Sequence, residues 1–417
     1  MNSFARIQDF DDPGFDPFRT FDIAQGFGEV EDPFPKIHEL HGQATVHRGD
    51  LREHFDLKPF PVWDDMPSVF VMGYPLVERV YGDAVTFSNA VMQRIYDHSF
   101  GASINGMDAP EHALYRRLFQ RAFMPQKVAD WGGRLVPAVI QRTIDPFARR
   151  GKAELVSEFT IKYPFDVVYG QLELPPEELQ AFHRLAVGLM CITVDFPHAA
   201  EASQKMGNYF ELLLEERRSA PSEDLVGLLA RAEIDGERIP DDVTVSFLRQ
   251  LMNAAGDTTY RSTGSLLVGL LTHPEQLEAV RADRSIVPRA VEEALRWDGP
   301  LTSLTRLATR DVVLDGIEVA AGTKVDVVAG SANRDPDRYE RPDEFDIHRP
   351  PSRNMAFAFG PHVCLGQHLA RLEMSRALNA LLDRLPNLRL DPDFPVPTVT
   401  GLNSRAPRAV HVLFDPR

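Results

Sequence analysis

Hydrophobic side chains recur every three to four positions along most of the chain, which is the spacing of one face of an α-helix. Clear examples are residues 110–123, 177–190 and 206–218. Alternating apolar and polar positions indicate strands, and they are confined to short stretches, namely residues 154–159, 311–330 and 408–414. The pattern therefore predicts a mainly α-helical fold with small antiparallel β-sheets.

The same pattern favours a single large domain. Asp315 and Gly316 lie between two alternating runs, which is a strong hairpin signal. No repeated strand–helix–strand units occur, so a dinucleotide-binding fold is not supported. Residues 1–60 are rich in Asp, Pro and His, and we expect them to form loops and short helices of the same fold as residues 61–417.

The longest predicted helix covers residues 243–271 and would span about 43 Å. Its two ends are apolar, whereas its centre, residues 254–259, is small and polar. Such a centre costs stability in a buried helix, because Gly loses backbone entropy and Asp needs a partner. The segment is therefore either a kinked core helix with a self-satisfied polar patch, or a helix against which a large ligand lies.

Composition narrows the classes of function. The 417 residues carry a net charge of −16, and an acidic surface of this kind repels nucleic acid. Cys191 and Cys364 are the only cysteines, which is typical of a reducing compartment. No run approaches the roughly 20 apolar residues of a membrane span, and residues 1–18 lack a signal-peptide pattern. We expect a soluble, cytoplasmic protein without membrane or nucleic-acid partners.

The segment 357–366 carries the most distinctive chemistry. Cys364 lies where a loop is predicted to turn into a helix, so backbone N–H groups and the helix dipole can stabilise a thiolate. Gly360 and Gly366 would let the backbone approach a flat ligand closely. A flat ligand that a thiolate can bind is haem, and thiolate ligation of haem iron favours O–O cleavage. An ordinary buried thiol is the alternative for a lone cysteine.

This segment resembles the haem-binding loop of the cytochrome P450 superfamily, with Cys364 as the iron ligand. The positions that match the family pattern are Phe357, Gly360, His362 and Gly366. Ala358 stands where the family often has another glycine. The resemblance covers roughly residues 60–417 and implies the cytochrome P450 fold with heme b, iron protoporphyrin IX, bound through the cysteine.

Other family motifs follow in the expected order. Asp257 and Thr258 resemble the acid–threonine pair of oxygen activation, with Ala255 at the position of an earlier family glycine. Glu293 and Arg296 resemble the family's E-x-x-R motif, and Arg349 resembles the arginine that completes its buried network. The same spacing recurs at other places, where a surface ion pair is the ordinary explanation, namely Glu215/Arg218, Glu278/Arg281 and Glu373/Arg376.

Four basic side chains match family positions that meet the haem propionates. His112 and Arg116 are four residues apart and so share a helix face. Arg306 and His362 would be further partners. Any one of these basic side chains alone would ordinarily be a solvated surface residue. Four of them at these positions favour a dianionic cofactor.

The resemblance implies a haem-dependent monooxygenase that inserts one oxygen atom of O2 into a lipophilic small molecule. Electrons are expected from NAD(P)H through a ferredoxin reductase and a ferredoxin, and the protein is expected to be a monomer. Two alternatives are a peroxide-driven peroxygenase, which needs no acid–threonine pair, and a non-catalytic haem sensor, which should carry an output module.

The sequence gives weaker evidence about the electron donor and about the substrate. Arg116, Arg117, Arg121 and Lys127 form a local basic group that would attract an acidic ferredoxin, unless they are merely solvated. By family analogy the substrate pocket includes Ala254, Ala255, Leu301, Leu304 and Leu402. Further apolar lining is expected from Phe87, Met92, Ile95, Phe100, Leu189 and Met190. Terpenoid, steroid and small aromatic substrates all fit this description.

Overall fold

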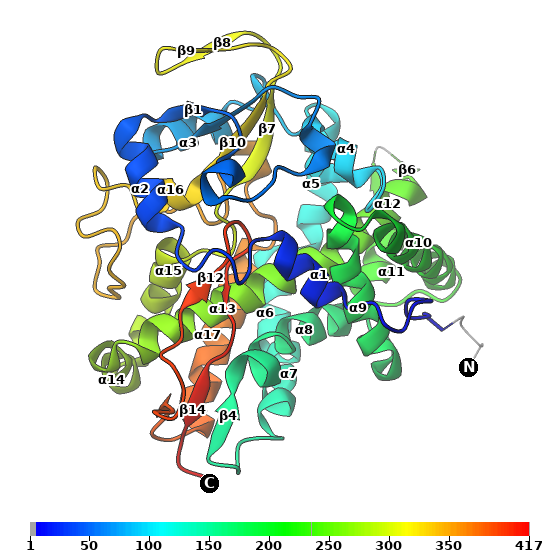
Figure 1. Ribbon diagram of the computed structural model, residues 1–417. Helices are drawn as coiled ribbons and strands as arrows, with labels where there is room; N and C mark the ends of the chain where they lie inside the picture. Colours follow the sequence, from blue (N-terminus) through cyan, green and yellow to red (C-terminus); the bar gives the residue numbers. More distant parts are fainter. Residues whose placement is uncertain (1–5, 235, 417) are drawn as a thin grey trace.

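A computed structural model describes residues 6–234 and 236–416, so the first five residues of the predicted segment 1–60 lie outside the described residues. Helices dominate the molecule, with the largest sheet at one end and small two- and three-stranded sheets elsewhere (Figure 1). The predicted fold class, mainly helical with small sheets, is confirmed. None of the helices in the described ranges combines the length and apolar character that crossing a bilayer requires.

The helices begin with two short ones near the N-terminus. In chain order the α-helices are α1 (Pro17–Ala24), α2 (Phe34–Gln43), α3 (Tyr74–Gly82), α4 (Gln93–Tyr96), α5 (Glu111–Ala122), α6 (Pro125–Gly133), α7 (Leu135–Ile144), α8 (Tyr163–Gln171), α9 (Leu179–Met190), α10 (Phe196–Ser219), α11 (Leu225–Ala230), α12 (Asp241–Ala254), α13 (Asp257–Leu271), α14 (Pro274–Ala282), α15 (Val287–Trp297), α16 (Ala329–Asn333) and α17 (Gln367–Arg384).

The strands are short. They are β1 (Val46–Arg48), β2 (Ser68–Val71), β3 (Phe87–Ser88), β4 (Lys152–Glu154), β5 (Glu233–Ile234), β6 (Glu237–Arg238), β7 (Leu304–Ala308), β8 (Val312–Leu314), β9 (Ile317–Val319), β10 (Lys324–Val327), β11 (Arg389–Leu390), β12 (Val399–Thr400), β13 (Ala406–Pro407) and β14 (His411–Leu413).

The largest sheet has five strands in the order β1-β2-β10-β7-β3. Strands β2 and β10 run parallel, whereas the other pairs of this sheet are antiparallel. The expectation of antiparallel sheets is corrected at this one pairing. Apolar alternation indicates a strand but not its direction, and strands far apart in the chain are not bound by hairpin geometry.

Two predicted β stretches had different outcomes. The hairpin of β8 and β9 is confirmed, with Asp315 and Gly316 both at positive φ, as a tight hairpin turn requires. The stretch 154–159 was predicted wrongly, because β4 ends at Glu154 and a π-helical turn follows. The Glu154 carboxylate accepts the next free backbone N–H groups, those of Val156 and Ser157, and so ends the strand.

The predicted helix 243–271 is interrupted, which corrects that expectation. Helix α12 begins at Asp241 and ends at Ala254, and α13 begins at Asp257. At the break the N–H of Gly256 bonds to the carbonyl of Asn253, three residues back, instead of four. A Cβ on Gly256 would lie 2.5 Å from the ring of Phe165, so only glycine lets α13 approach α8 here.

The core surrounds α13, which packs against α8, α15 and α17. The N-terminal segment belongs to the same core, since Phe10, Phe15 and Phe21 are buried in its largest apolar cluster. Figure 1 shows α13 and α17 crossing the middle of the molecule, with the five-stranded sheet above them. This arrangement brings the helix break and the cysteine loop into the interior.

Candidate active site

The cysteine loop ends at α17, as the sequence predicted. A 3₁₀ turn covers Gly360–His362, and the N–H of Cys364 donates to the carbonyl of Phe357 at 2.9 Å. The Cys364 side chain remains accessible although protein surrounds it. Burial raises the pKa of its thiol, while the backbone N–H of Gly366 and the charge of Arg116 act in the opposite direction. The loop therefore presents sulfur beside N–H donors and a cation.

The shape of this loop depends on two residues with positive φ. Gly360 has φ 76°, and a Cβ there would lie 2.6 Å from the carbonyl oxygen of Tyr81 in α3. Ala358 has φ 57°, a left-handed conformation that costs a residue with a Cβ about 1–2 kcal/mol. This explains why the family pattern often has glycine at that position, and it shows that the loop conformation is kept with alanine.

The four predicted basic residues come together near this loop. The rings of His112 in α5 and His362 are 3.9 Å apart between centroids. Arg116 donates to the carbonyl of Val363 at 2.7 Å, directly beside the cysteine. The Arg306 guanidinium of β7 lies 5.1 Å from the ring centroid of Tyr81. Electrostatic coupling of His362 with His112, Arg306 and Arg116 places all four basic side chains in one cluster.

One carboxylate, Asp108, acts on His112 and Arg306 through its charge, but it accepts hydrogen bonds from Ser88 and Asn89 and forms no ion pair with the cluster. Nε2 of His112 and Nδ1 of His362 are buried without a hydrogen-bond partner, and no carboxylate among the described residues forms an ion pair with the four basic side chains. Burial, followed by the charges of His112, Arg306 and Arg116, lowers the pKa of His362 to about 3. Two carboxylates such as haem propionates would satisfy these donors, so the residues fit the cofactor that the sequence implied.

The predicted acid–threonine pair lies at the helix break. Thr258 Oγ1 donates to the carbonyl of Ala254 at 2.9 Å. The Asp257 carboxylate pairs with Arg261 Nε at 2.9 Å, and Arg261 also reaches Asp22 of α1 at 3.3 Å. Arg261 and Asp22 were not predicted as site residues. The i, i+4 spacing of Asp257 and Arg261 could have revealed the first partner, but nothing in the sequence indicates the second.

A cavity of about 320 Å³ extends from this break toward the five-stranded sheet. Ala254, Leu301, Leu304 and Leu402 line it as predicted, and so do Met92, Ile95, Phe100, Leu189 and Met190. Two predictions are wrong. Ala255 packs against the apolar core instead, and Phe87 is fully buried between the sheet and α3. The sequence also missed polar lining residues, among them Gln25, Asp50, Lys324 and Asp326.

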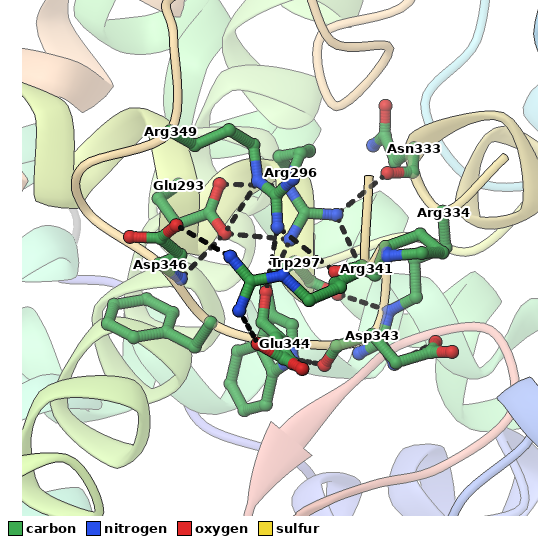
Figure 2. A network of polar contacts seen from close by, with 12 residues as sticks. Glu293, Arg296, Trp297, Asn333, Arg334, Arg341, Asp343, Glu344, Asp346 and Arg349 are labelled. Atoms are coloured by element: carbon green, nitrogen blue, oxygen red, sulfur yellow. Dashed lines mark hydrogen bonds and ion pairs between the residues drawn. The ribbon is translucent and has the colours of Figure 1, made fainter. Parts of the chain in front are cut away.

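The E-x-x-R side chains of α15 meet the predicted third arginine (Figure 2). Arg296 binds both carboxylate oxygens of Glu293, at 2.8 and 2.7 Å, and Arg349 Nε lies 3.4 Å from the same carboxylate. Arg296 also donates to three backbone carbonyls, those of Asn333, Pro342 and Glu344. The network thus ties α15 to α16 and to the irregular segment before the cysteine loop.

The other E-x-x-R pairs differ from one another. Glu278 and Arg281 form the expected surface ion pair. Arg218 pairs with Asp241 rather than with Glu215. The interpretation fails for Glu373, whose carboxyl is buried in α17 with Oε2 unpartnered, while Arg376 is exposed. Burial raises the pKa of Glu373 well above its ordinary value.

Comparison with known proteins agrees with this geometry. The family model for cytochrome P450 matches residues 178–397. Cytochrome P450-terp of a Pseudomonas species is 30% identical over 89% of this chain and 91% of its own length. Steroid C26-monooxygenase of Mycolicibacterium smegmatis is 35% identical over 74% of this chain and 79% of its own.

A solved structure extends the likeness to nearly the whole fold. Cytochrome P450 CYP109Q5 from Chondromyces apiculatus superimposes with a TM-score of 0.82 at 30% identity, and the match covers 94% of this chain and 98% of that one. The family match, the relatives and the fold all lead to the same family. This chain belongs to the cytochrome P450 family and is a haem-dependent monooxygenase.

Proposed function

We propose that this P450 hydroxylates a neutral or weakly polar lipophilic molecule with O2, using electrons delivered by a ferredoxin. The observation that carries the proposal is the pairing of an accessible cysteine at a helix start with a cluster of four basic side chains that forms no ion pair with a carboxylate among the described residues. An apolar cavity that begins at Thr258 supports a lipophilic substrate.

Cys364 is proposed as the only protein ligand of the haem iron. His112, Arg116, Arg306 and His362 would hold the propionates, since their donors converge beside the cysteine loop. Bound there, thiolate-ligated haem supplies the electron push that favours O–O cleavage. The chain keeps the cysteine loop in place by two contacts: Gly360 packs closely against α3, and the N–H of Cys364 donates to the carbonyl of Phe357.

Thr258 and Asp257 are proposed to deliver protons to the cavity. The Thr258 hydroxyl gives its hydrogen to the Ala254 carbonyl, so its lone pairs are left to accept a hydrogen bond from a group in the cavity. Asp257 is held by Arg261, which leads to the partly exposed Asp22. Arg261 keeps its own protons and holds the two carboxylates near each other, so proton transfer from the surface would pass through water from Asp22 to Asp257 and onward through water to Thr258.

The acid–threonine pair favours the monooxygenase over a peroxide-driven enzyme. The experiment compares turnover supported by NADH, ferredoxin and reductase with turnover supported by hydrogen peroxide alone. We expect turnover of lipophilic compounds with NADH, ferredoxin and reductase. Thr258→Ala should keep its haem but divert NADH electrons to hydrogen peroxide. Thr259→Ala is the matched control, because Thr259 is buried outside the cavity. Full coupling in Thr258→Ala, or turnover with peroxide alone, would contradict the proposal.

A ferredoxin is proposed to dock on α5. Arg117 and Arg121 are exposed on this helix, and Arg116 of the same helix reaches the backbone beside Cys364. Basic groups on an otherwise acidic protein would attract an acidic partner and speed its association at low salt. The double substitution Arg117→Glu/Arg121→Glu should slow reduction and flatten its salt dependence. Arg19→Glu/Arg149→Glu changes the same charge at two exposed arginines away from α5 and should not.

A further inference from the structure

The wall of the cavity formed by the five-stranded sheet carries a buried charged cluster. Lys324 Nζ donates to Asp50 Oδ2 and to Asp326 Oδ2, both at 2.7 Å. All three residues line the cavity, and each is less than 8% exposed. We call these three residues the Lys324 cluster.

The fold accounts for only part of this cluster, namely Asp50, which caps the 3₁₀ helix Leu51–Phe55. In β10, Lys324 and Asp326 lie on one face of the sheet, while Val325 and Val327 on the other face pack in the apolar core with α3. Removing three charges from water costs several kcal/mol per ion. Replacing buried ion pairs by apolar residues of similar volume often leaves the protein equally stable or more stable. A role in the cavity would account for the charges.

The hydrogen bonds of the cluster leave a donor. The carboxylate oxygens are used: Asp326 Oδ1 accepts from Thr305 at 2.8 Å and Asp50 Oδ1 from the N–H of Arg52 at 2.9 Å. The Lys324 ammonium has three hydrogens, and the two carboxylates take two of them. Burial alone would lower the pKa of Lys324, but the charges of Asp326 and Asp50 raise it, so the group stays charged. Its third hydrogen is available to the cavity.

A second observation points to a ligand at the same cavity. Gln25 lines it, is 7% exposed, and its side-chain oxygen Oε1 is buried without a hydrogen-bond partner within the described residues. A buried amide oxygen without a partner costs free energy that a ligand donor would recover. The residues that line the cavity therefore include one unused donor and one unused acceptor.

We propose that the Lys324 cluster and Gln25 anchor an oxygen of the substrate, which makes the substrate class a neutral lipophilic molecule with a hydroxyl or carbonyl group. Lys324 donates to that oxygen, and Gln25 Oε1 accepts from a hydroxyl. Lys324 and Arg52, which also lines the cavity, balance the negative charges of Asp50 and Asp326, so this wall offers a fatty-acid carboxylate no uncompensated cation, and alcohols are favoured over fatty acids. This inference deepens the proposed function and rests on it.

The test measures binding by calorimetry with the haem-loaded protein, using two matched pairs of probes. The oxygenated probes are testosterone and α-terpineol, and their hydrocarbon counterparts are 5α-androstane and limonene. Lys324→Met should weaken the oxygenated probes about 10- to 100-fold, which corresponds to one hydrogen bond to a charged group, and leave the hydrocarbons unchanged. Hexadecanol should bind more tightly than hexadecanoate.

Lys205→Met is the matched control. Lys205 also bridges two carboxylates, those of Asp11 and Glu201 at 2.7 and 2.6 Å, but it lies outside the cavity. It should change none of the affinities. Two further variants keep the test decisive should Lys324→Met not fold: the double substitution Lys324→Met/Asp326→Asn preserves the net charge of the cluster, and Gln25→Leu removes an oxygen that has no partner.

Several results of these binding measurements would contradict the anchoring of a substrate oxygen. Equal losses for oxygenated probes and hydrocarbons, no loss for either, no binding of any of the four probes by the unmodified protein, or tighter binding of hexadecanoate than of hexadecanol would overturn the proposal. Unchanged α-terpineol binding in Gln25→Leu would contradict the acceptor role. Because binding is read without turnover, these failures are distinct from failure of the proposed monooxygenase activity, which would appear as absent NADH-driven product.

Discussion

Replacing Arg296 by alanine tests the buried network of α15 most severely. Arg296 is 3% exposed and makes two bonds to Glu293 and three to backbone carbonyls. Without it the Glu293 carboxylate, 5% exposed, keeps only Arg349 at 3.4 Å and the N–H of Asp346 at 2.9 Å. Breaking a buried ion pair from one side costs about 3–5 kcal/mol.

This cost can be expressed as a melting temperature. A chain of 417 residues has an unfolding entropy of about 0.9 kcal/mol/K, so 3–5 kcal/mol lowers the melting temperature by about 3–6 °C. The assay is thermal unfolding followed by circular dichroism, together with Soret absorbance per protein as a measure of haem content. Arg296→Ala should melt lower and carry less haem.

The matched control for this experiment is Arg281→Ala. Arg281 has the same spacing to Glu278, but that carboxylate is largely exposed, and exposed pairs contribute about 0–1 kcal/mol. Arg281→Ala should therefore shift the melting temperature by no more than about 1 °C. Equal damage from the two substitutions would refute the distinction between a buried network and a surface pair.

Three further substitutions have defined outcomes. Gly360→Ala places a Cβ against the Tyr81 carbonyl at positive φ, so it should lower haem content, whereas retention of full Soret absorbance would contradict the required close approach. Glu373 holds a proton in the native state that the unfolded chain releases above about pH 4.3, so the free energy of unfolding should fall as pH rises above that value. Urea unfolding at about pH 5 and 8 measures this fall, and Glu373→Gln should abolish it. Asp257→Asn should keep haem but reduce NADH-driven turnover by about 10²-fold, and unchanged turnover would remove Asp257 from the proton route.

Motifs with fixed spacing to the cysteine were predictable from the sequence. The loop 357–366 is a local pattern, and a local pattern leads directly to neighbouring side chains on a turn. The pair Glu293/Arg296 shares its spacing with three other pairs, so it was predictable, like Arg349, only because its position follows the family order. These residues meet in the structure as expected, around α15 and the start of α17.

The partners contributed by distant segments were not predictable. Asp50 and Lys324 are 274 positions apart, and Asp22 and Arg261 are 239 apart, so only the folded chain brings their charges together. A one-residue error had a similar origin. Ala254 lines the cavity and Ala255 does not, because the helix break sets which small residue faces the cavity.

The spectrum of the reduced protein with carbon monoxide tests the central claim, ligation of the haem iron by Cys364. The unmodified protein and Cys191→Ala should both show the red-shifted Soret band of thiolate ligation, since Cys191 is buried away from the site with its thiol near the Pro17 carbonyl. Cys364→His should lose that band while still binding haem. Retention of the band in Cys364→His, or its loss in Cys191→Ala, would contradict the assignment.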